Sequence, residues 1–174
     1  MARLPENYEF KEATTGNYFK IKEEKQAFRI LTSPIIWYEY FREMGDGKVK
    51  PVRQKEPFNW TPKDSNKEQA PKEFWAFVVY NHTEGKIQIM ELTQRTLMKI
   101  ILDLSHSEDW GDPKTYDLEI SKTGKGTDTK YAMTPLPKSR FESDDKYNEV
   151  LEASKEVKLE ALYEWEDPFN TNPF

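Results

Sequence analysis

Cysteine is absent from the 174 residues, and histidine occurs only at His82 and His106. The first absence excludes disulfides and thiolate metal sites, and the scarcity of imidazoles argues against zinc, so we expect no metal and no other cofactor. No stretch approaches the roughly 20 apolar residues of a membrane span, and residues 1–5 lack the apolar run of a signal peptide. We therefore expect a soluble, cytoplasmic protein without a membrane partner.

Catalytic constellations are also scarce. There is no cysteine nucleophile and no Ser/His/acid set, and His106 sits beside Glu108 and Asp109 with no second histidine nearby. The run Gly124-Lys125-Gly126 lacks the spacing of a phosphate-binding Walker loop, so it indicates a hairpin turn, with or without phosphate contacts from its lysine. The chain is predicted not to be an enzyme. A metal-dependent hydrolase remains an alternative only through one dense set of carboxylates: Asp109, Asp112, Asp117 and Glu119.

Charge divides the chain into two parts. The whole sequence has 26 basic and 31 acidic side chains, a net charge of −5. Residues 141–174 hold 3 of the basic and 10 of the acidic side chains, a net charge of −7, which leaves +2 on residues 1–140. An acidic tail on a mildly basic body is typical of a nucleic-acid binder whose tail competes with the phosphate backbone, although acidic termini can also serve solubility alone.

Hydrophobic patterning predicts one folded domain over residues 1–140, with an N-terminal arm, followed by an acidic, partly helical tail over residues 141–174. Apolar runs and alternation predict strands near residues 28–31, 35–41, 73–80, 86–92, 115–120 and 129–133. A helix is expected after Thr93, and residues 50–72 are expected to be irregular. Because no βαβ alternation repeats, the predicted fold is all-β with one or two helices, an OB-fold-like five-stranded antiparallel barrel.

Aromatic and basic residues interleave in the first half of the chain, as binding of a single strand without sequence preference requires. About two in three of these rings should be core, and the Tyr38 and Tyr40 face is predicted to be the solvent side of its strand. The predicted DNA contacts are Trp37, Tyr38, Tyr40, Arg42, Arg53, Lys55 and Trp60, with Lys122, Lys125 and Lys130 from a lysine-rich hairpin.

The last eleven residues combine carboxylates, aromatic rings and a terminal Pro-Phe without a basic side chain. Such a segment offers a partner protein a negative field and a hydrophobic anchor together. The predicted partner-binding residues are Glu164, Glu166, Asp167, Pro168, Phe169, Pro173 and Phe174.

Several segments over residues 18–174 share the pattern of one known group. They are Phe28-Arg29-Ile30-Leu31, Lys55-Glu56-Pro57-Phe58, Phe74-Trp75-Ala76-Phe77-Val78-Val79, residues 86–94, residues 116–131, and Leu159-Glu160-Ala161-Leu162 ahead of Asp167-Pro168-Phe169. The chain resembles phage single-stranded DNA-binding replication proteins and is distantly similar to the helix-destabilising protein of T-even phages. Its Pro173-Phe174 end is similar to the tails of bacterial single-strand binding proteins.

This resemblance implies an OB fold that coats exposed DNA strands in a phage-infected bacterial host. It also implies an acidic C-terminus that recruits replication and recombination proteins. The chain departs from the T-even protein in lacking the cysteine of a zinc-binding insertion, so no zinc subdomain is carried over.

The functional prediction is binding and protection of single-stranded DNA, without sequence specificity, during phage-type replication, recombination or repair. A protein-interaction adaptor and an RNA-binding OB-fold module remain alternatives, because base stacking and phosphate contacts do not distinguish DNA from RNA.

Overall fold

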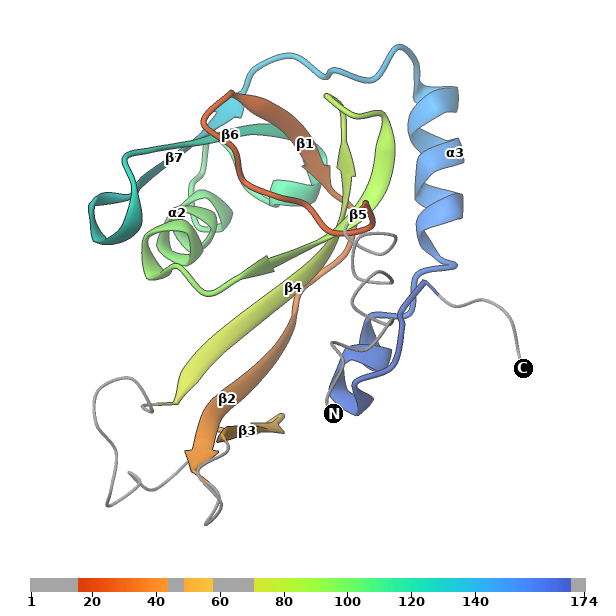
Figure 1. The fold of residues 1–174 in the computed structure, drawn as a ribbon. Helices are drawn as coiled ribbons and strands as arrows, with labels where there is room; N and C mark the ends of the chain where they lie inside the picture. Colours follow the sequence, from red (N-terminus) through yellow and green to blue (C-terminus); the bar gives the residue numbers. More distant parts are fainter. Residues whose placement is uncertain (1–15, 44–48, 58–70, 170–174) are drawn as a thin grey trace.

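A seven-stranded sheet forms the body of the computed structural model, which describes residues 16–43, 49–57 and 71–169 (Figure 1). Its strands are β1 (Gln26–Ile30), β2 (Ile35–Glu43), β3 (Val49–Gln54), β4 (Lys72–Asn81), β5 (Lys86–Leu92), β6 (Asp117–Thr123) and β7 (Lys130–Leu136). The helices of the described part are α2 (Arg95–Ser105) and α3 (Asp144–Ser154), with short 3-10 helices η2 (Pro113–Thr115), η3 (Gly126–Asp128) and η4 (Leu159–Glu164).

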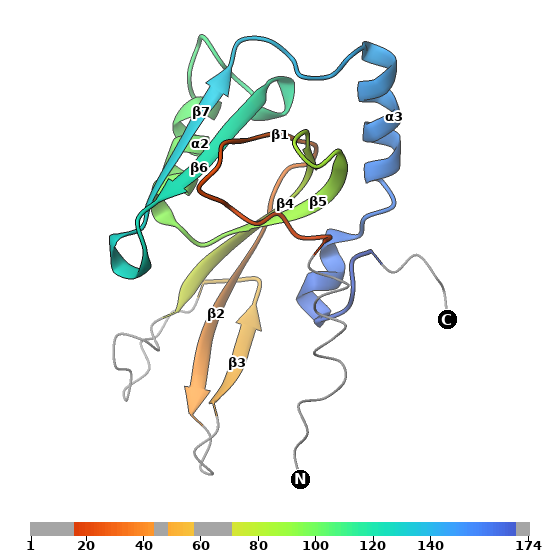
Figure 2. The same ribbon diagram turned by 45° about the horizontal axis from the view of Figure 1, so that its top comes forward.

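Strand β4 is the longest and organises the sheet. One edge pairs with β2, with Ile36 opposite Trp75, and further along with β1, with Arg29 opposite Tyr80. The other edge pairs with β5. Strand β1 also pairs with β6, and β6 with β7, so all pairings between strands are antiparallel. Strands β2 and β3 extend the sheet as a two-stranded arm, which is joined to the other five strands through the pairing of β2 with the first half of β4 (Figure 2).

The prediction of an all-β fold with one or two helices is confirmed. Two features differ from the expected five-stranded barrel: the sheet has seven strands, and it is not closed. The five strands β5-β4-β1-β6-β7, with α2 between β5 and β6 in the chain, supply the expected OB-fold-like part. Oligonucleotide-binding folds are themselves only partly closed, so the open edge does not disturb that assignment.

The prediction of an irregular segment over residues 50–72 is wrong at the beginning of that range, where β3 pairs with β2. Pro51 lies opposite Phe41, and Arg53 lies opposite Glu39. A proline lacks the N–H that a ladder needs, so it is tolerated in β3 because only one edge of this strand is paired. The proline and the polar residues around it concealed the strand from sequence patterning.

The inner face of the sheet, defined here as the face covered by α2, carries the larger core. Phe28, Phe77 and Met90 project from β1, β4 and β5 and are almost fully buried. The helix expected after Thr93 is confirmed as α2. Leu97, Ile100, Ile101 and Leu104, which lie at helical spacing, and the adjacent Met98 belong to this cluster or pack against it. Leu118, Ile120 and Met133 continue the same cluster onto β6 and β7.

The outer face, opposite to α2, is covered by the C-terminal part of the chain. Figures 1 and 2 show α2 and α3 on opposite sides of the sheet. Val78 of β4 and Ile89 of β5 are completely buried on this face, and Val150 of α3 and Leu159 and Leu162 of η4 pack into the same cluster. Residues 141–169 are thus a folded cover of the sheet, and the segment that was expected to be partly helical contains α3 and η4.

Leu159→Ala tests this packing, because Leu159 is 5% exposed. Removing a buried leucine side chain is expected to lower the free energy of unfolding by about 2–5 kcal/mol, measured by urea denaturation. Glu160→Ala, at an exposed neighbouring position, is the control and should change it by no more than about 0.5 kcal/mol. Equal small effects of the two substitutions would show that the cover is not part of the stable fold.

Candidate nucleic-acid interface

The outer face of β4 and β5, with the β2–β3 arm at one end, corresponds to the surface that OB folds use. Such folds bind oligonucleotides on their second and third strands and on the loops after the first and fourth strands. In this chain those strands are β4 and β5, the first connection contains the β2–β3 arm, and the second is the β6–β7 hairpin tip.

Trp37 lies at the centre of the arm but is completely buried. Its ring stacks on Phe74 at a centroid distance of 5.3 Å and an interplanar angle of 10°. Its Nε1 donates a hydrogen bond of 2.9 Å to Oε1 of Glu39. The prediction of Trp37 as an exposed stacking ring is corrected: in this conformation no base can reach it.

Arg53 joins the arm to the C-terminal cover. Its guanidinium forms an ion pair with Glu39 and donates a hydrogen bond to the backbone carbonyl of Leu162. The Cζ atom of Arg53 lies 4.7 Å from the centroid of the Trp37 ring and 3.6 Å from that of Trp165. Arg53 is thus held by a carboxylate, a carbonyl and two aromatic rings, and the Trp165 ring takes a position at which a nucleobase could stack.

A second cation of the arm makes a similar contact. Lys55 Nζ lies 4.5 Å from the centroid of the Tyr163 ring, whose hydroxyl donates a hydrogen bond of 3.2 Å to the backbone carbonyl of Ile36. The predicted DNA contacts Arg53 and Lys55 therefore both lie beneath aromatic residues of the chain's own acidic segment. Since Lys55 itself is exposed, its ammonium group also faces solvent.

The predicted partner-binding residues divide into two groups. Glu164, Glu166 and Asp167 are exposed, whereas Pro168 is buried and its carbonyl accepts a 2.9 Å hydrogen bond from the backbone N–H of Lys158. Phe169 is half-buried, with its ring 6.3 Å from that of Tyr18. The assignment of Pro168 and Phe169 as free anchors is therefore corrected, because both pack against the body. Pro173 and Phe174 lie outside the described residues.

The two tyrosines of β2 are not on the same face as Arg53. Tyr38 lies opposite Gln54 and points to the inner face, where its hydroxyl lies 3.4 Å from Oε1 of Glu73. Partial burial, with the Glu73 carboxylate nearby, raises the pKa of Tyr38. Tyr40 is only 9% exposed, which corrects its prediction as a solvent-side ring. Arg42 lies in β2, but its side chain and the whole of Trp60 are outside the described residues.

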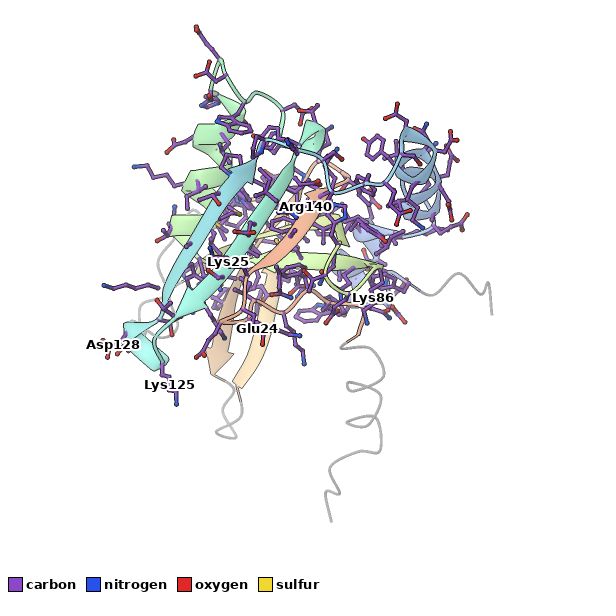
Figure 3. All side chains as sticks on the ribbon, turned by 90° about the horizontal axis from the view of Figure 1, so that it is seen from above. Glu24, Lys25, Lys86, Lys125, Asp128 and Arg140 are labelled. Carbon is purple, nitrogen blue, oxygen red and sulfur yellow. The ribbon has the colours of Figure 1, made fainter. Side chains whose placement is uncertain are left out.

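The β6–β7 hairpin presents the other predicted cations. Lys122 is half-buried, and Lys125 and Lys130 are exposed around the tip, where Figure 3 shows Lys125 beside Asp128. Gly124 has a φ of 82°, and a Cβ atom there would lie 2.3 Å from the Asp128 carbonyl oxygen, so glycine is required. The expected glycine turn is confirmed. Whether its lysines contact phosphate stays a prediction.

Residues 16–22 supply a basic surface that the sequence analysis missed. Their strand-like segment runs along the free edge of β5, where the Phe19 N–H donates to the Ile89 carbonyl at 2.8 Å. Together with the β4–β5 turn it surrounds a pocket of about 290 Å³ lined in part by Tyr18, Lys20, Lys22 and Lys86. The alternation of Tyr18, Lys20 and Lys22 with Phe19 and Ile21 was the available signal.

This segment connects the two groups of cations. Tyr18 contacts Phe169 on the side of the arm, and burial, with the carboxylates of Glu91 and Asp167 nearby, raises its pKa to about 12. On the other side, the Lys122 N–H donates a 3.0 Å hydrogen bond to the Lys22 carbonyl. Rings and cations thus follow one another from Arg53, across the C-terminal segment and residues 18–22, to the β6–β7 hairpin.

A buried ion cluster fixes the other end of the cover. Asp117 accepts hydrogen bonds from Nε of Arg29 at 2.8 Å, from the backbone N–H of Arg140, and lies 2.9 Å from Nε2 of His82. Burial alone would raise its pKa, but these hydrogen bonds outweigh burial and hold the pKa of Asp117 below its ordinary value. Phe141 packs over this cluster, 4.5 Å from the His82 ring and 5.2 Å from Arg29 Cζ.

The carboxylates proposed for a hydrolase do not form a site. Asp117 is committed to this cluster, Asp112 accepts the N–H of Lys114 at the start of η2, and Glu119 lies near Lys25 at 3.9 Å. Within the described ranges no group of three His, Asp or Glu residues could hold a metal ion.

In the same part of the chain, none of the helices has the length and apolar character needed to cross a bilayer.

No family model, no curated protein and no solved structure matches the chain.

Asp117→Asn is expected to lower the free energy of unfolding at pH 7 by about 3–5 kcal/mol, because it leaves Arg29 buried without its anion. The native pKa lies below the unfolded value of about 3.9, so the stabilisation is complete above that value and is lost as pH falls through the native pKa. Urea denaturation between pH 7 and pH 3 should show the gap to the wild type narrowing below about pH 4. A constant gap, or an equal effect of Asp112→Asn, would contradict this role.

Proposed function

We propose that the protein binds single-stranded DNA without sequence specificity, in phage-type replication, recombination or repair, and that its acidic C-terminal segment competes with the DNA. The observation that carries the proposal is the placement of Arg53 between the rings of Trp37 and Trp165. The resemblance to phage single-stranded DNA-binding proteins supports it, as does the position of the cover on the outer face of β4 and β5.

The C-terminal segment offers the body the same chemistry as a single strand. A strand binds through bases that stack on aromatic or guanidinium planes and through phosphates that pair with cations. Trp165 and Tyr163 lie over Arg53 and Lys55 as bases would. Glu164, Glu166 and Asp167 are exposed beside these rings and supply negative charge as phosphates would. Both ligands therefore require the same surface.

Displacement of residues 158–169 is sufficient to open the surface. Trp37 and Arg53 are covered from η4 and Trp165, whereas α3 is also held through Phe141 and Tyr147, which pack over Arg29. Opening exposes the buried side chains of Leu159, Leu162 and Pro168, and the two leucines alone cost about 3–6 kcal/mol at roughly 1.5–3 kcal/mol each. A cost of this size reduces apparent affinity by about a hundredfold to ten-thousandfold, so the segment is an effective competitor.

Partner recruitment follows from the same exchange. With DNA bound, residues 158–169 would leave the sheet and present Glu164, Trp165, Glu166 and Asp167 together with their continuation to the C-terminus. Trp165 is already 58% exposed and adopts a left-handed conformation with a φ of 59°. An aromatic residue among carboxylates is a suitable anchor for a basic, hydrophobic groove on a replication or recombination protein.

Deletion of residues 165–174 is expected to tighten binding to single-stranded oligo-dT at least about fivefold at low salt, with a smaller effect near 0.2 M salt. The deletion removes the Trp165 ring and the carboxylates of Glu166 and Asp167 from the competing segment. Fluorescence anisotropy of a labelled oligonucleotide over a salt titration measures the effect. The matched control is Glu149→Gln with Glu152→Gln, which removes two exposed carboxylates of α3.

Equal affinities of the deletion and the full chain at every salt concentration would reject competition. The same titration with single-stranded RNA and with duplex DNA tests the ligand class, and quenching of tryptophan fluorescence reports contact with the rings. Absence of quenching and of binding to every nucleic acid would favour the adaptor alternative.

A further inference from the structure

A second pocket lies at the far end of β4 from the arm. It has a volume of about 360 Å³, within the range of small-molecule sites. Its lining includes Tyr80, Thr83, Arg140, Phe141, Glu142 and Lys146. Its walls come from three places: the edge of β1, the end of β4 with its turn, and the segment that leads into α3. The Arg53 surface, meaning Arg53 with the rings of Trp37 and Trp165, lies toward the other end of β4. Most of the ten residues of β4, about 30 Å of extended strand, separate it from this pocket.

The cations of this pocket are available to a ligand. Within the part of the chain that the structure describes, the Arg140 side chain has no hydrogen bond or ion pair, and only its backbone N–H is engaged, by Asp117. The described ion pair of Lys146 is with exposed Glu149 at 3.8 Å, a weak interaction in water. The Asp117 carboxylate pairs with Arg29 and lies 2.9 Å from His82 Nε2, and it accepts the backbone N–H of Arg140 rather than its guanidinium.

The remaining lining completes a site for a phosphate that carries a ring. The Thr83 hydroxyl oxygen accepts the Ala27 N–H at 3.3 Å, which leaves its proton free to donate. Tyr80 and Phe141 both line the pocket and are stacked on each other, with centroids 5.4 Å apart and an interplanar angle of 30°. Glu142 is the one carboxylate of the lining and opposes an anion.

From this geometry we infer that the pocket binds a nucleoside monophosphate group. Arg140, with two parallel N–H donors, and Lys146 hold the phosphate, Thr83 donates to one of its oxygens, and the nucleoside packs against the edges of the stacked Tyr80 and Phe141 rings. The group is either a free nucleotide or the 5′-terminal nucleotide of a strand, since both present the same phosphate monoester. The site does not overlap the Arg53 surface, so it stands independently of the proposed function.

Figure 3 shows Arg140 well apart from Lys125 of the hairpin tip. The contacts agree, because Arg140 is bonded to Asp117 at the start of β6, whereas Lys125 follows its end. A ligand held by Arg140 therefore contacts a different end of the molecule from the lysine-rich hairpin.

Isothermal titration calorimetry of the full chain with dTMP, inorganic phosphate and thymidine tests the inference. Saturable binding of dTMP is expected, tighter than that of phosphate, with none for thymidine. Arg140→Gln should weaken dTMP binding about tenfold, since it removes a charge-assisted pair of hydrogen bonds, while Glu142→Gln should strengthen it about twofold to fivefold. The control is Lys155→Gln, because Lys155 is an exposed charge at the end of α3 that does not line the pocket.

The inference is overturned if dTMP shows no saturable binding at millimolar concentration, if it binds no tighter than phosphate, or if Arg140→Gln and Lys155→Gln weaken binding equally. Folding is not at risk, because no described residue depends on the Arg140 side chain, and circular dichroism melting of each variant verifies it. Short 5′-phosphorylated and 5′-hydroxyl oligo-dT then identify the source. Arg140-dependent preference for the phosphorylated strand assigns a strand end, and its absence with dTMP still bound assigns a free nucleotide.

Discussion

The guanidinium of Arg53 links the two parts of the molecule. It pairs with Glu39 across the β2–β3 arm, lies over the buried Trp37, and reaches the Leu162 carbonyl and the Trp165 ring of the C-terminal segment. A buried or partly buried guanidinium needs a compensating anion and acceptors, and here one of its acceptors and one of its rings come from residues more than a hundred positions away. Whatever removes the cover must therefore replace those contacts, and in the proposed function a polynucleotide does so.

The opposite net charges of the two parts are what the proposed competition between the cover and DNA depends on. Residues 141–174 carry −7 and residues 1–140 carry +2, so the cover is attracted to the body by the same field that attracts phosphates. The apolar packing of Val150, Leu159 and Leu162 depends little on salt concentration. The attraction between the charges of the two parts is screened by salt and weakens as the salt concentration rises. In the proposed exchange with DNA, the cluster of Arg29, His82 and Asp117 beneath Phe141 keeps α3 in place while residues 158–169 leave the sheet.

Local patterns predicted the elements except β3, but they did not predict which faces become covered. The apolar run of β4 and the spacing of Leu97, Ile100 and Ile101 in α2 identify their own structure, because their partners are generic apolar surfaces. The burial of Trp37 and Arg53 depends on Leu162 and Trp165, and such a long-range contact leaves no periodic signal near residue 37.

The errors at the site have the same origin. Tyr40 was predicted to face solvent because a phenol tolerates water, yet its environment is set by the rest of the fold and leaves it 9% exposed. Pro168 and Phe169 have the composition of a free tail, but Lys158 and Tyr18 hold them. Lys20 and Lys22 were overlooked because the edge of β5 that positions them cannot be located from their own sequence. Strand β3 was not predicted because Pro51 and its polar neighbours interrupt the apolar pattern of a strand.

Hydrogen–deuterium exchange of the full chain, with and without saturating oligo-dT, tests the exchange between cover and DNA most directly. Faster exchange of amides in residues 158–169 on adding DNA, with unchanged protection in β4, β5 and α3, is the result that the account predicts. Unchanged or stronger protection of residues 158–169 while DNA is bound would contradict it.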